Sequence, residues 1–377
     1  MVAVGRKRLG SGVEVSIMAL LWMDGFDLYD SFADAAGGGW STQTVGTNAA
    51  AINLTGGRTG AGCLDLHDNI TRVAFNLPVT QGFGETRIYA FSLKFVTTFL
   101  SSGSVPIITF LADNSSINGT LRMTVDSGGA LRFLDGLPIT TTTDFVFNLE
   151  QWYRVELKIT ASTVATSSDT RTGSVDCYID GNLVASFAAN IVWNSSTQIP
   201  IVTMLFGGST ANGHTLFDDL VIYDTSGSVN NSAPMGDVVI TTLRPDGEGS
   251  EQDWTANTGT AEGAIDDAAG SSDGDSTYIS SSTVGDKSEF TLGDLPDASA
   301  SILGVQARVK AKKSDAGTRT YRNYLLSNTS VANGDSISPA TDYDWMIGKP
   351  IEENPDGGAA WSDTTVNALE VGLETLT

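Results

Sequence analysis

Paired carboxylates are the first chemistry to look for in this chain, because glycoside hydrolysis needs two of them on either side of the scissile bond. The nearest candidates are Asp218 and Asp219, adjacent in the segment LFDDLVIYD. Successive side chains of a strand point to opposite faces, so we expect this pair not to act together. One carboxylate is expected to order a loop and the other to face solvent. We therefore predict no catalytic residues, and the chain is not expected to be an enzyme.

Metal and nucleophile patterns are also missing from the sequence. The two histidines, His67 and His214, have neither i, i+4 spacing nor a nearby cysteine. The serine-rich segments are not interpreted as a nucleophile elbow, although GSSDG at residues 270 to 274 has the G-x-S-x-G spacing. The glycine-rich stretches AAGGGW and TGGRTGAG lack the lysine of a phosphate loop, so we interpret them as turns. Cys63 and Cys177 are interpreted as buried, reduced thiols. We predict no metal site and no cofactor.

Two acidic loops offer hard oxygen ligands. They are PDGEGSEQDW, with Asp246, Glu248, Glu251 and Asp253, and DDAAGSSDGD, with Asp266, Asp267, Asp273 and Asp275. Their spacing does not match an EF-hand loop, so we interpret them as solvated loops rather than Ca²⁺ sites. A basic run, Arg308, Lys310, Lys312 and Lys313, alternates with apolar residues and is expected to line a solvent-exposed face of a strand or to meet the acid of a neighbouring subunit.

Tryptophans are the side chains best suited to hold a sugar, because a flat ring stacks on a pyranose. The candidates are Trp40, Trp193, Trp254, Trp345 and Trp361. Trp254 and Trp361 are expected in the core of a second domain.

The composition limits the partners. The chain has 377 residues, 41% of them hydrophobic, which is enough for two folded domains. Its net charge of -23 argues against nucleic acid and anionic membranes. No apolar run approaches the roughly 18 residues of a membrane span. Residues 237 to 377 hold 24 of the 44 acidic residues but only 9 of the 21 basic ones, which suggests a domain boundary near residue 237.

The elements that must carry these residues are strands. Apolar residues alternate in FSLKFV and WYRVELKI, where Arg154, Glu156 and Lys158 form the polar side. Asp180-Gly181 between two apolar runs predicts a hairpin. The segment TSGSVNNSAPMG breaks the pattern and indicates a linker, residues 227 to 236. We predict an all-β protein: an antiparallel jelly-roll sandwich over residues 18 to 226 and a second, smaller β-sandwich over residues 237 to 377.

The order of segments WYRVELKI, GSVDCYIDGNLV and LFDDLVIYD resembles the laminin-G/concanavalin-A-like jelly-roll superfamily. The resemblance implies a fold rather than an activity, since that superfamily holds lectins, glycanases and structural domains. The opening MALLWMDGFDLYD, Met18 to Asp30, with Trp40 and GRTGAGCLDL from Gly57, is similar to structural proteins of tailed bacteriophages that begin at the equivalent of Met18. Residues 1 to 17 are therefore expected to be an upstream in-frame extension or a short assembly arm.

The segments DWTANTG, STYISSS, VQARVKAKKSDAGTR and AWSDTTVNALEVGLE resemble a C-terminal module of phage virion proteins. The resemblance implies a structural component on the particle surface, made in the bacterial cytoplasm, with tail attachment and host-glycan contact ranked ahead of capsid decoration. Its expected partners are other virion proteins and further copies of itself. The alternatives are a free carbohydrate-binding adhesin and, ranked last, a depolymerase.

Overall fold

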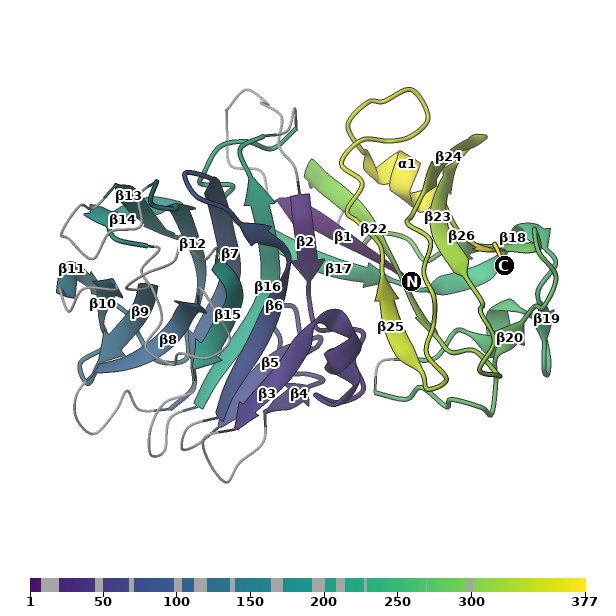
Figure 1. Ribbon diagram of the computed structural model, residues 1–377, viewed down its shortest axis with the longest axis horizontal. Helices are drawn as coiled ribbons and strands as arrows, with labels where there is room; N and C mark the ends of the chain where they lie inside the picture. The colour runs from purple at the N-terminus through teal and green to yellow at the C-terminus, as the bar shows by residue number, and fades with distance from the viewer. Residues whose placement is uncertain are drawn as a thin grey trace. The chain divides into compact units, whose positions relative to one another are not determined.

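The computed structural model describes residues 1–7, 20–44, 50–67, 71–97, 104–111, 121–135, 140–163, 172–191, 201–207, 214–226, 229–268, 270–296 and 301–377. Helical structure in this part of the chain is limited to η1 (Asp34–Gly38), η2 (Glu262–Ala264) and α1 (Asp363–Asn367), and none of these could cross a membrane. The remaining elements are strands, which confirms the all-β prediction (Figure 1).

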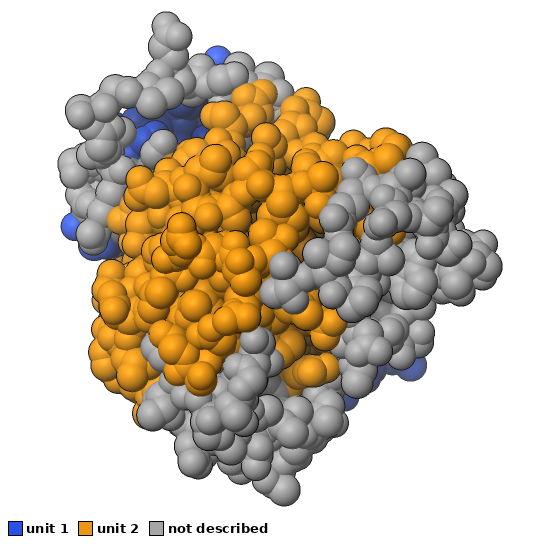
Figure 2. All heavy atoms as spheres, turned by 90° about the vertical axis from the view of Figure 1, so that its left-hand side faces the viewer, with its two compact units in different colours: residues 1–38, 228–230, 238–377 blue, residues 39–227, 231–237 orange. Residues whose placement is uncertain are grey.

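The chain divides into two compact units, coloured separately in Figure 2. Unit 1 comprises residues 1–38, 228–230 and 238–377, and unit 2 comprises residues 39–227 and 231–237.

Unit 2 is an antiparallel jelly-roll sandwich of two sheets. Sheet A has the strand order β11 (Thr140–Val146), β10 (Ala130–Asp135), β9 (Leu121–Asp126), β8 (Ser104–Leu111), β15 (Ile201–Gly207), β6 (Thr71–Gln81) and β3 (Trp40–Thr44). Sheet B has the order β14 (Asn182–Ala189), β13 (Gly173–Ile179), β12 (Trp152–Thr160), β7 (Thr86–Phe95), β16 (His214–Asp224), β5 (Cys63–His67) and β4 (Ala51–Asn53). The predicted hairpin joins β13 to β14, with Asp180 and Gly181 both at positive φ.

Aromatic side chains fill the space between the two sheets of unit 2. Trp40 of β3 is 1% exposed and lies 5.2 Å, ring centre to ring centre, from Phe206 of β15. Phe206 in turn lies 5.2 Å from Phe217 of β16, so rings from sheet A and sheet B interlock. This is the core that the alternating segments predicted.

The outer face of sheet B is buried as well, which the alternation did not predict. Glu156 is fully buried, and its carboxylate accepts hydrogen bonds from the Tyr223 hydroxyl at 2.7 Å and from the backbone of Met235 and Gly236 at 2.8 Å each. The predicted linker is therefore partly wrong: residues 231–237 belong to unit 2, tied down because a buried carboxylate needs donors.

Unit 1 is the smaller β-sandwich. Sheet C has the order β17 (Val238–Leu243), β1 (Val2–Lys7), β22 (Ser301–Ala311) and β25 (Asp344–Ile347). Sheet D has the order β18 (Pro245–Gln252), β21 (Lys287–Leu292), β26 (Glu370–Thr375), β23 (Tyr321–Ser327) and β24 (Ser330–Asn333). A short ladder joins β19 (Thr255–Ala256) to β20 (Ile279–Ser280). The core between sheets C and D contains Val4, Val305, Phe290, Trp361 and Val371.

The N-terminal residues correct the prediction for residues 1 to 17. Val2–Lys7 is not an extension or arm, because β1 pairs antiparallel with β17 on one side and with β22 on the other (Figure 1). Val2 and Val4 are fully buried in the core of unit 1. A strand with both edges paired and one face in the core is part of the sheet's structure. Residues 8 to 17 lie outside the described part of the chain.

The segment that opens with β2 (Leu20–Asp24) also belongs to unit 1, although it was predicted to begin the first domain. Asp24 is fully buried and lies 3.2 Å from the Arg308 guanidinium, which is 1% exposed. Asp24 also accepts hydrogen bonds from the Tyr29 hydroxyl at 2.8 Å and the Phe26 backbone at 3.0 Å. Arg308 donates to the Met23 carbonyl. This network holds the segment against β22.

The basic run of β22 thus differs from the prediction. Arg308 and Lys310 share one face of the strand, but that face is not open to solvent, because the segment Leu20–Gly38 supplies Asp24, Asp30 and Asp34 as their partners. The acid comes from the same unit rather than from a neighbouring subunit.

Replacing Arg308 by methionine should lower the free energy of unfolding by about 3–5 kcal/mol, because Asp24 would be left buried and unpaired. Urea denaturation measures this change, and adding Asp24→Asn should recover part of it. Lys349→Met, which removes an exposed pair with Asp335, is the control and should cost about 1 kcal/mol or less. An equal loss in both variants would contradict a dominant role for the buried pair.

Candidate functional site

A pocket of about 840 Å³ lies in unit 1 and takes residues from both sheets. Sheet C contributes Val309 and Ala311 of β22, and sheet D contributes Leu373 and Thr375 of β26 together with Tyr321 of β23. In β22, Val309 points to the same side of the strand as the core residues Val305 and Ala307. Val309 lies beyond the packed core and lines the pocket. The sandwich therefore leaves a hollow beside its own core.

Two hydroxyls line this pocket without a partner. Tyr321 and Thr375 face each other across β23 and β26 and are 5% and 6% exposed. Neither hydroxyl has a hydrogen-bond partner among the described residues. Burial raises the pKa of Tyr321, so its hydroxyl stays protonated and able to donate. An unpaired buried polar group costs about 1–3 kcal/mol.

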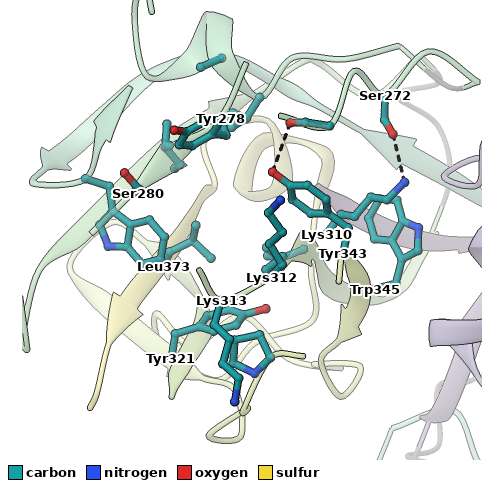
Figure 3. A pocket seen from close by; sticks show the side chains of 18 of the residues that line it. Ser272, Tyr278, Ser280, Lys310, Lys312, Lys313, Tyr321, Tyr343, Trp345 and Leu373 are labelled. Carbon is teal, nitrogen blue, oxygen red and sulfur yellow. Dashed lines mark hydrogen bonds between the residues drawn. The ribbon is translucent and has the colours of Figure 1, made fainter. Parts of the chain in front are cut away.

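Aromatic rings line the pocket both at Tyr278 and beside the lysines, where Tyr343 lies next to Lys312 (Figure 3). Trp254 is held by its indole N–H, which donates to the Asp286 carbonyl at 3.3 Å, and by its backbone N–H, which donates to the Ser288 hydroxyl at 3.0 Å. Tyr278 is 37% exposed, and its backbone is fixed by two hydrogen bonds with Asn257. These anchors leave the ring faces available for stacking.

Lys312 and Tyr343 form a fixed polar edge. The Lys312 ammonium lies 4.5 Å from the centre of the Tyr343 ring and 2.5 Å from an Asp275 oxygen. Burial, and then the hydrogen bond to Asp275, raise the pKa of Tyr343 to about 12. The bond from Lys312 holds the pKa of Asp275 below its usual value. Lys313 also lines the pocket and has no ion-pair partner among the described residues.

Lys310 of β22 and its cross-strand neighbour Trp345 of β25 lie on the face of sheet C that is covered by the segment Leu20–Gly38. Lys310 lies 2.7 Å from Asp34 and 3.1 Å from Asp30, and its ammonium is 5.7 Å from the Trp345 ring centre. Burial alone would lower the pKa of Lys310, but the bonds to Asp34 and Asp30 outweigh it and the pKa is raised. Trp345 is 3% exposed, so it is a packing residue rather than a stacking platform.

The acidic side chains of the two segments are mostly exposed to solvent, as predicted, and some of them also make hydrogen bonds. Asp273 accepts hydrogen bonds from the Thr277 backbone and hydroxyl, at 3.1 and 2.9 Å, and so positions the neighbouring Tyr278. The other segment forms strand β18 rather than a loop, and its Glu248 accepts a hydrogen bond from the backbone of Ala261 at 2.9 Å. No group of histidine, cysteine or acidic side chains in the described residues could hold a metal ion.

Asp218 and Asp219 do not behave as predicted from strand alternation. Both are buried, at 4% and 2% exposure, because β16 has an irregularity between Asp218 and Val221 and Asp219 takes a φ of 50°. Asp218 accepts a hydrogen bond from the Arg58 backbone at 2.8 Å, and Asp219 lies 3.4 Å from the Arg58 guanidinium. The bulge turns both carboxylates toward one arginine, so the prediction that one faces solvent was wrong.

The remaining candidates lie apart from the pocket of unit 1. His214 lies 2.7 Å from Asp65 in unit 2, and His67 is its cross-strand neighbour, although the side chain of His67 is outside the described part. Cys63 and Cys177 are buried free thiols, as predicted, and burial raises the pKa of Cys177. Trp361 is a core residue of unit 1, as predicted, whereas Trp254 lines the pocket. Trp193 lies outside the described residues.

No family model and no curated protein matches this chain. Among solved structures, an endo-β-1,4-glucuronan lyase from the fungus Trichoderma reesei is 13% identical with a TM-score of 0.41, covering 55% of this chain and 97% of its own. The alginate lyase Aly36B is 16% identical with a TM-score of 0.38, covering 54% and 96%. A Trypanosoma rangeli sialidase is 14% identical with a TM-score of 0.33, covering 49% of this chain and 30% of its own.

These matches contradict the prediction that the chain is not an enzyme, because the structures it resembles include two polysaccharide lyases and a sialidase. At these identities the likeness concerns the fold alone and assigns no reaction to this chain.

Sequence reasoning missed Tyr321, Thr375, Tyr278 and Tyr343. Tyr321 and Thr375 sit in ordinary alternating strands, where nothing in the spacing separates a pocket position from a core position. A signal was available for Tyr278 and Tyr343, since each follows closely on a Ser- or Asp-rich loop.

Replacing Tyr321 by phenylalanine should raise the free energy of unfolding by about 1–3 kcal/mol, because it removes a buried hydroxyl that has no partner. Tyr324→Phe on the same strand is the matched control. The Tyr324 hydroxyl donates to buried Glu289 at 2.8 Å, so its loss should cost about 1–3 kcal/mol. Chemical denaturation of both variants compares them, and an equal cost would show that the Tyr321 hydroxyl is paired.

Proposed function

We propose that the protein binds a saccharide in the pocket of unit 1, on the surface of a tailed-bacteriophage particle. The observation that carries the proposal is the combination of exposed aromatic ring faces with two buried, unpartnered hydroxyls in a single pocket. Stacking surface and hydrogen-bonding groups in one hollow are what a sugar requires.

A pyranose has an apolar ring face and polar hydroxyls, and the pocket lining suits both. Its C–H face is apolar and stacks on rings such as Trp254 and Tyr278. Its hydroxyls donate and accept, which suits the Tyr321 and Thr375 hydroxyls that have no other partner. A wholly apolar ligand would leave both hydroxyls unpaired, so a hydroxylated ligand is favoured.

Charge within the pocket adds selectivity. Lys312 is neutralised by Asp275, whereas Lys313 has no ion-pair partner among the described residues. The protein as a whole carries a net charge of -23, which repels anions at long range. A neutral sugar is therefore favoured, with any acidic substituent limited to the part of the pocket beside Lys313.

The location on a phage particle rests on the sequence resemblance of the segment Met18 to Asp30 and of the C-terminal module. A high net negative charge keeps a surface protein made in many copies soluble before assembly. Of the two locations on the particle, we favour the tail, where the phage contacts host glycans, over decoration of the capsid. We also expect the protein to form homo-oligomers within the particle.

Saccharide binding is tested with oligosaccharides released from the host surface polysaccharide, titrated into the full chain by calorimetry. Trp254→Ala should weaken binding about 10-fold or more through the lost stacking surface, and Tyr321→Phe about 5-fold through one lost hydrogen bond. Lys349→Met, an exposed residue outside the pocket, is the matched control and should leave the binding unchanged. The absence of saturable binding, or binding indifferent to both pocket variants, would reject the proposal.

The location is tested by quantitative peptide mass spectrometry of purified particles of the phage that encodes the chain. A few to a few dozen copies per particle are expected for a tail component, measured against the major capsid protein. Hundreds of copies would instead favour capsid decoration. Complete absence of its peptides would reject the virion assignment and leave the free adhesin.

A further inference from the structure

Unit 2 contains a second pocket, of about 360 Å³, on the outer side of sheet B. Five residues line it: Arg58, Trp152, Arg154, Asp180 and Asp237. Trp152 and Arg154 are on β12, Asp180 is in the turn between β13 and β14, and Arg58 is in the glycine-rich turn before β5. All five belong to unit 2.

Arg154 is the unusual member of this set. Its side chain is buried, with the residue 3% exposed, and its Nη1 donates to the Asp219 carbonyl at 2.7 Å. Its Nε and Nη2 have no hydrogen-bond partner among the described residues. Burial lowers the pKa of Arg154, but an arginine remains charged, so two donors of a buried cation are left unused.

The carboxylates nearby are already engaged elsewhere. Asp219 accepts from the Ser92 hydroxyl at 3.0 Å and lies beside Arg58, and Asp237 pairs with Arg58. Asp180 uses one oxygen to accept from the Arg154 backbone at 2.8 Å. These carboxylates therefore accept their hydrogen bonds from donors other than Nε and Nη2 of Arg154.

Local backbone features hold this arrangement in place. A Cβ on Gly57 would lie 2.5 Å from the Gly62 carbonyl, so the tight turn that carries Arg58 needs glycine there. Asp219 is held at a φ of 50° in the irregular part of β16, which brings its carbonyl to Arg154. Non-glycine residues at positive φ persist where the surroundings enforce them, often at functional sites.

The free edge of Arg154 defines the ligand. Nε and Nη2 lie on one side of the planar guanidinium and donate in parallel, which fits two neighbouring oxygen atoms. A carboxylate or a vicinal diol offers such a pair. The wall holds two arginines and two aspartates, so it is electrically balanced, and the second oxygens of Asp180 and Asp237 can accept from hydroxyls but would repel an anion.

We propose that this pocket is a second saccharide site, which binds a neutral pyranose by a vicinal diol. The two diol oxygens accept from Nε and Nη2 of Arg154, the diol hydroxyls donate to Asp180 and Asp237, and the sugar ring lies against Trp152. The site does not depend on the pocket of unit 1, since it shares no residue with it.

The test uses the full chain and the methyl pyranosides of glucose, galactose and mannose, with glucuronate as the anionic comparison. Saturation-transfer NMR detects binding, and titration gives the affinity. At least one neutral pyranoside should bind saturably and about 10-fold more tightly than glucuronate. Arg154→Lys, which keeps the charge but loses the paired donors, should weaken that binding about 10-fold or more, and Trp152→Ala should have a similar effect.

Because the pocket of unit 1 is also proposed to bind a saccharide, Arg154→Lys and Trp152→Ala are compared within a Trp254→Ala, Tyr321→Phe variant. Lys349→Met, outside both pockets, is the matched control and should leave this binding unchanged. Circular dichroism and the melting temperature of Arg154→Lys and Trp152→Ala verify that both variants fold, and the partly exposed Trp152 gives a readout independent of the buried arginine. Loss of all pyranoside binding in the Trp254→Ala, Tyr321→Phe variant would mean that unit 1 holds the sole site and would overturn this proposal while leaving the proposed function intact. Tighter binding of glucuronate, or no saturable pyranoside, would also overturn it.

Discussion

The buried pair of Arg308 and Asp24 is the interaction on which unit 1 depends. A guanidinium that is 1% exposed is stable only if a carboxylate and carbonyls surround it, and in this chain they come from residues nearly three hundred positions earlier. The segment Leu20–Gly38 must therefore lie on the outer face of β22. Lys310 follows on the same face and is fixed by Asp30 and Asp34. The opposite face of β22 is then left to form the core, and residues of both faces line the pocket.

Buried charge organises unit 2 in the same manner. Glu156 accepts hydrogen bonds from the backbone of Met235 and Gly236, and Asp218 accepts one from the backbone of Arg58. In each case a carboxylate on a strand is satisfied by a segment without regular structure. Much of the acid in this strongly negative chain is therefore used to position loops. The segment around Met235 and the turn that carries Arg58 are held against sheet B in this way.

Alternation of apolar residues was sufficient to predict the strands, the hairpin at Asp180-Gly181 and the two sandwiches. It failed where the outer face of a sheet is covered, because the covering segment is distant in sequence. Arg154 and Glu156 share a face as their spacing requires, yet both are buried. Asp218 and Asp219 departed from alternation because of a bulge, which no residue type in LFDDLVIYD signals. Tyr321, which lines the pocket, and Leu325, which lies in the core, are on the same strand, β23. Their environments differ because sheets C and D pack against each other at Leu325 but leave the pocket at Tyr321.

Several buried polar atoms in the described residues lack a partner, and most of them carry no functional meaning by themselves. Tyr321, Thr375 and Arg154 differ because they line hollows that a ligand can enter. Filling such a hollow with packed side chains would remove the cost of the unpaired groups, about 1–3 kcal/mol for each. Elsewhere in the chain a buried donor is paired with a carboxylate, as Arg308 is with Asp24. Unpaired donors on residues that line a pocket beside aromatic side chains are the observation on which both proposed saccharide sites rest.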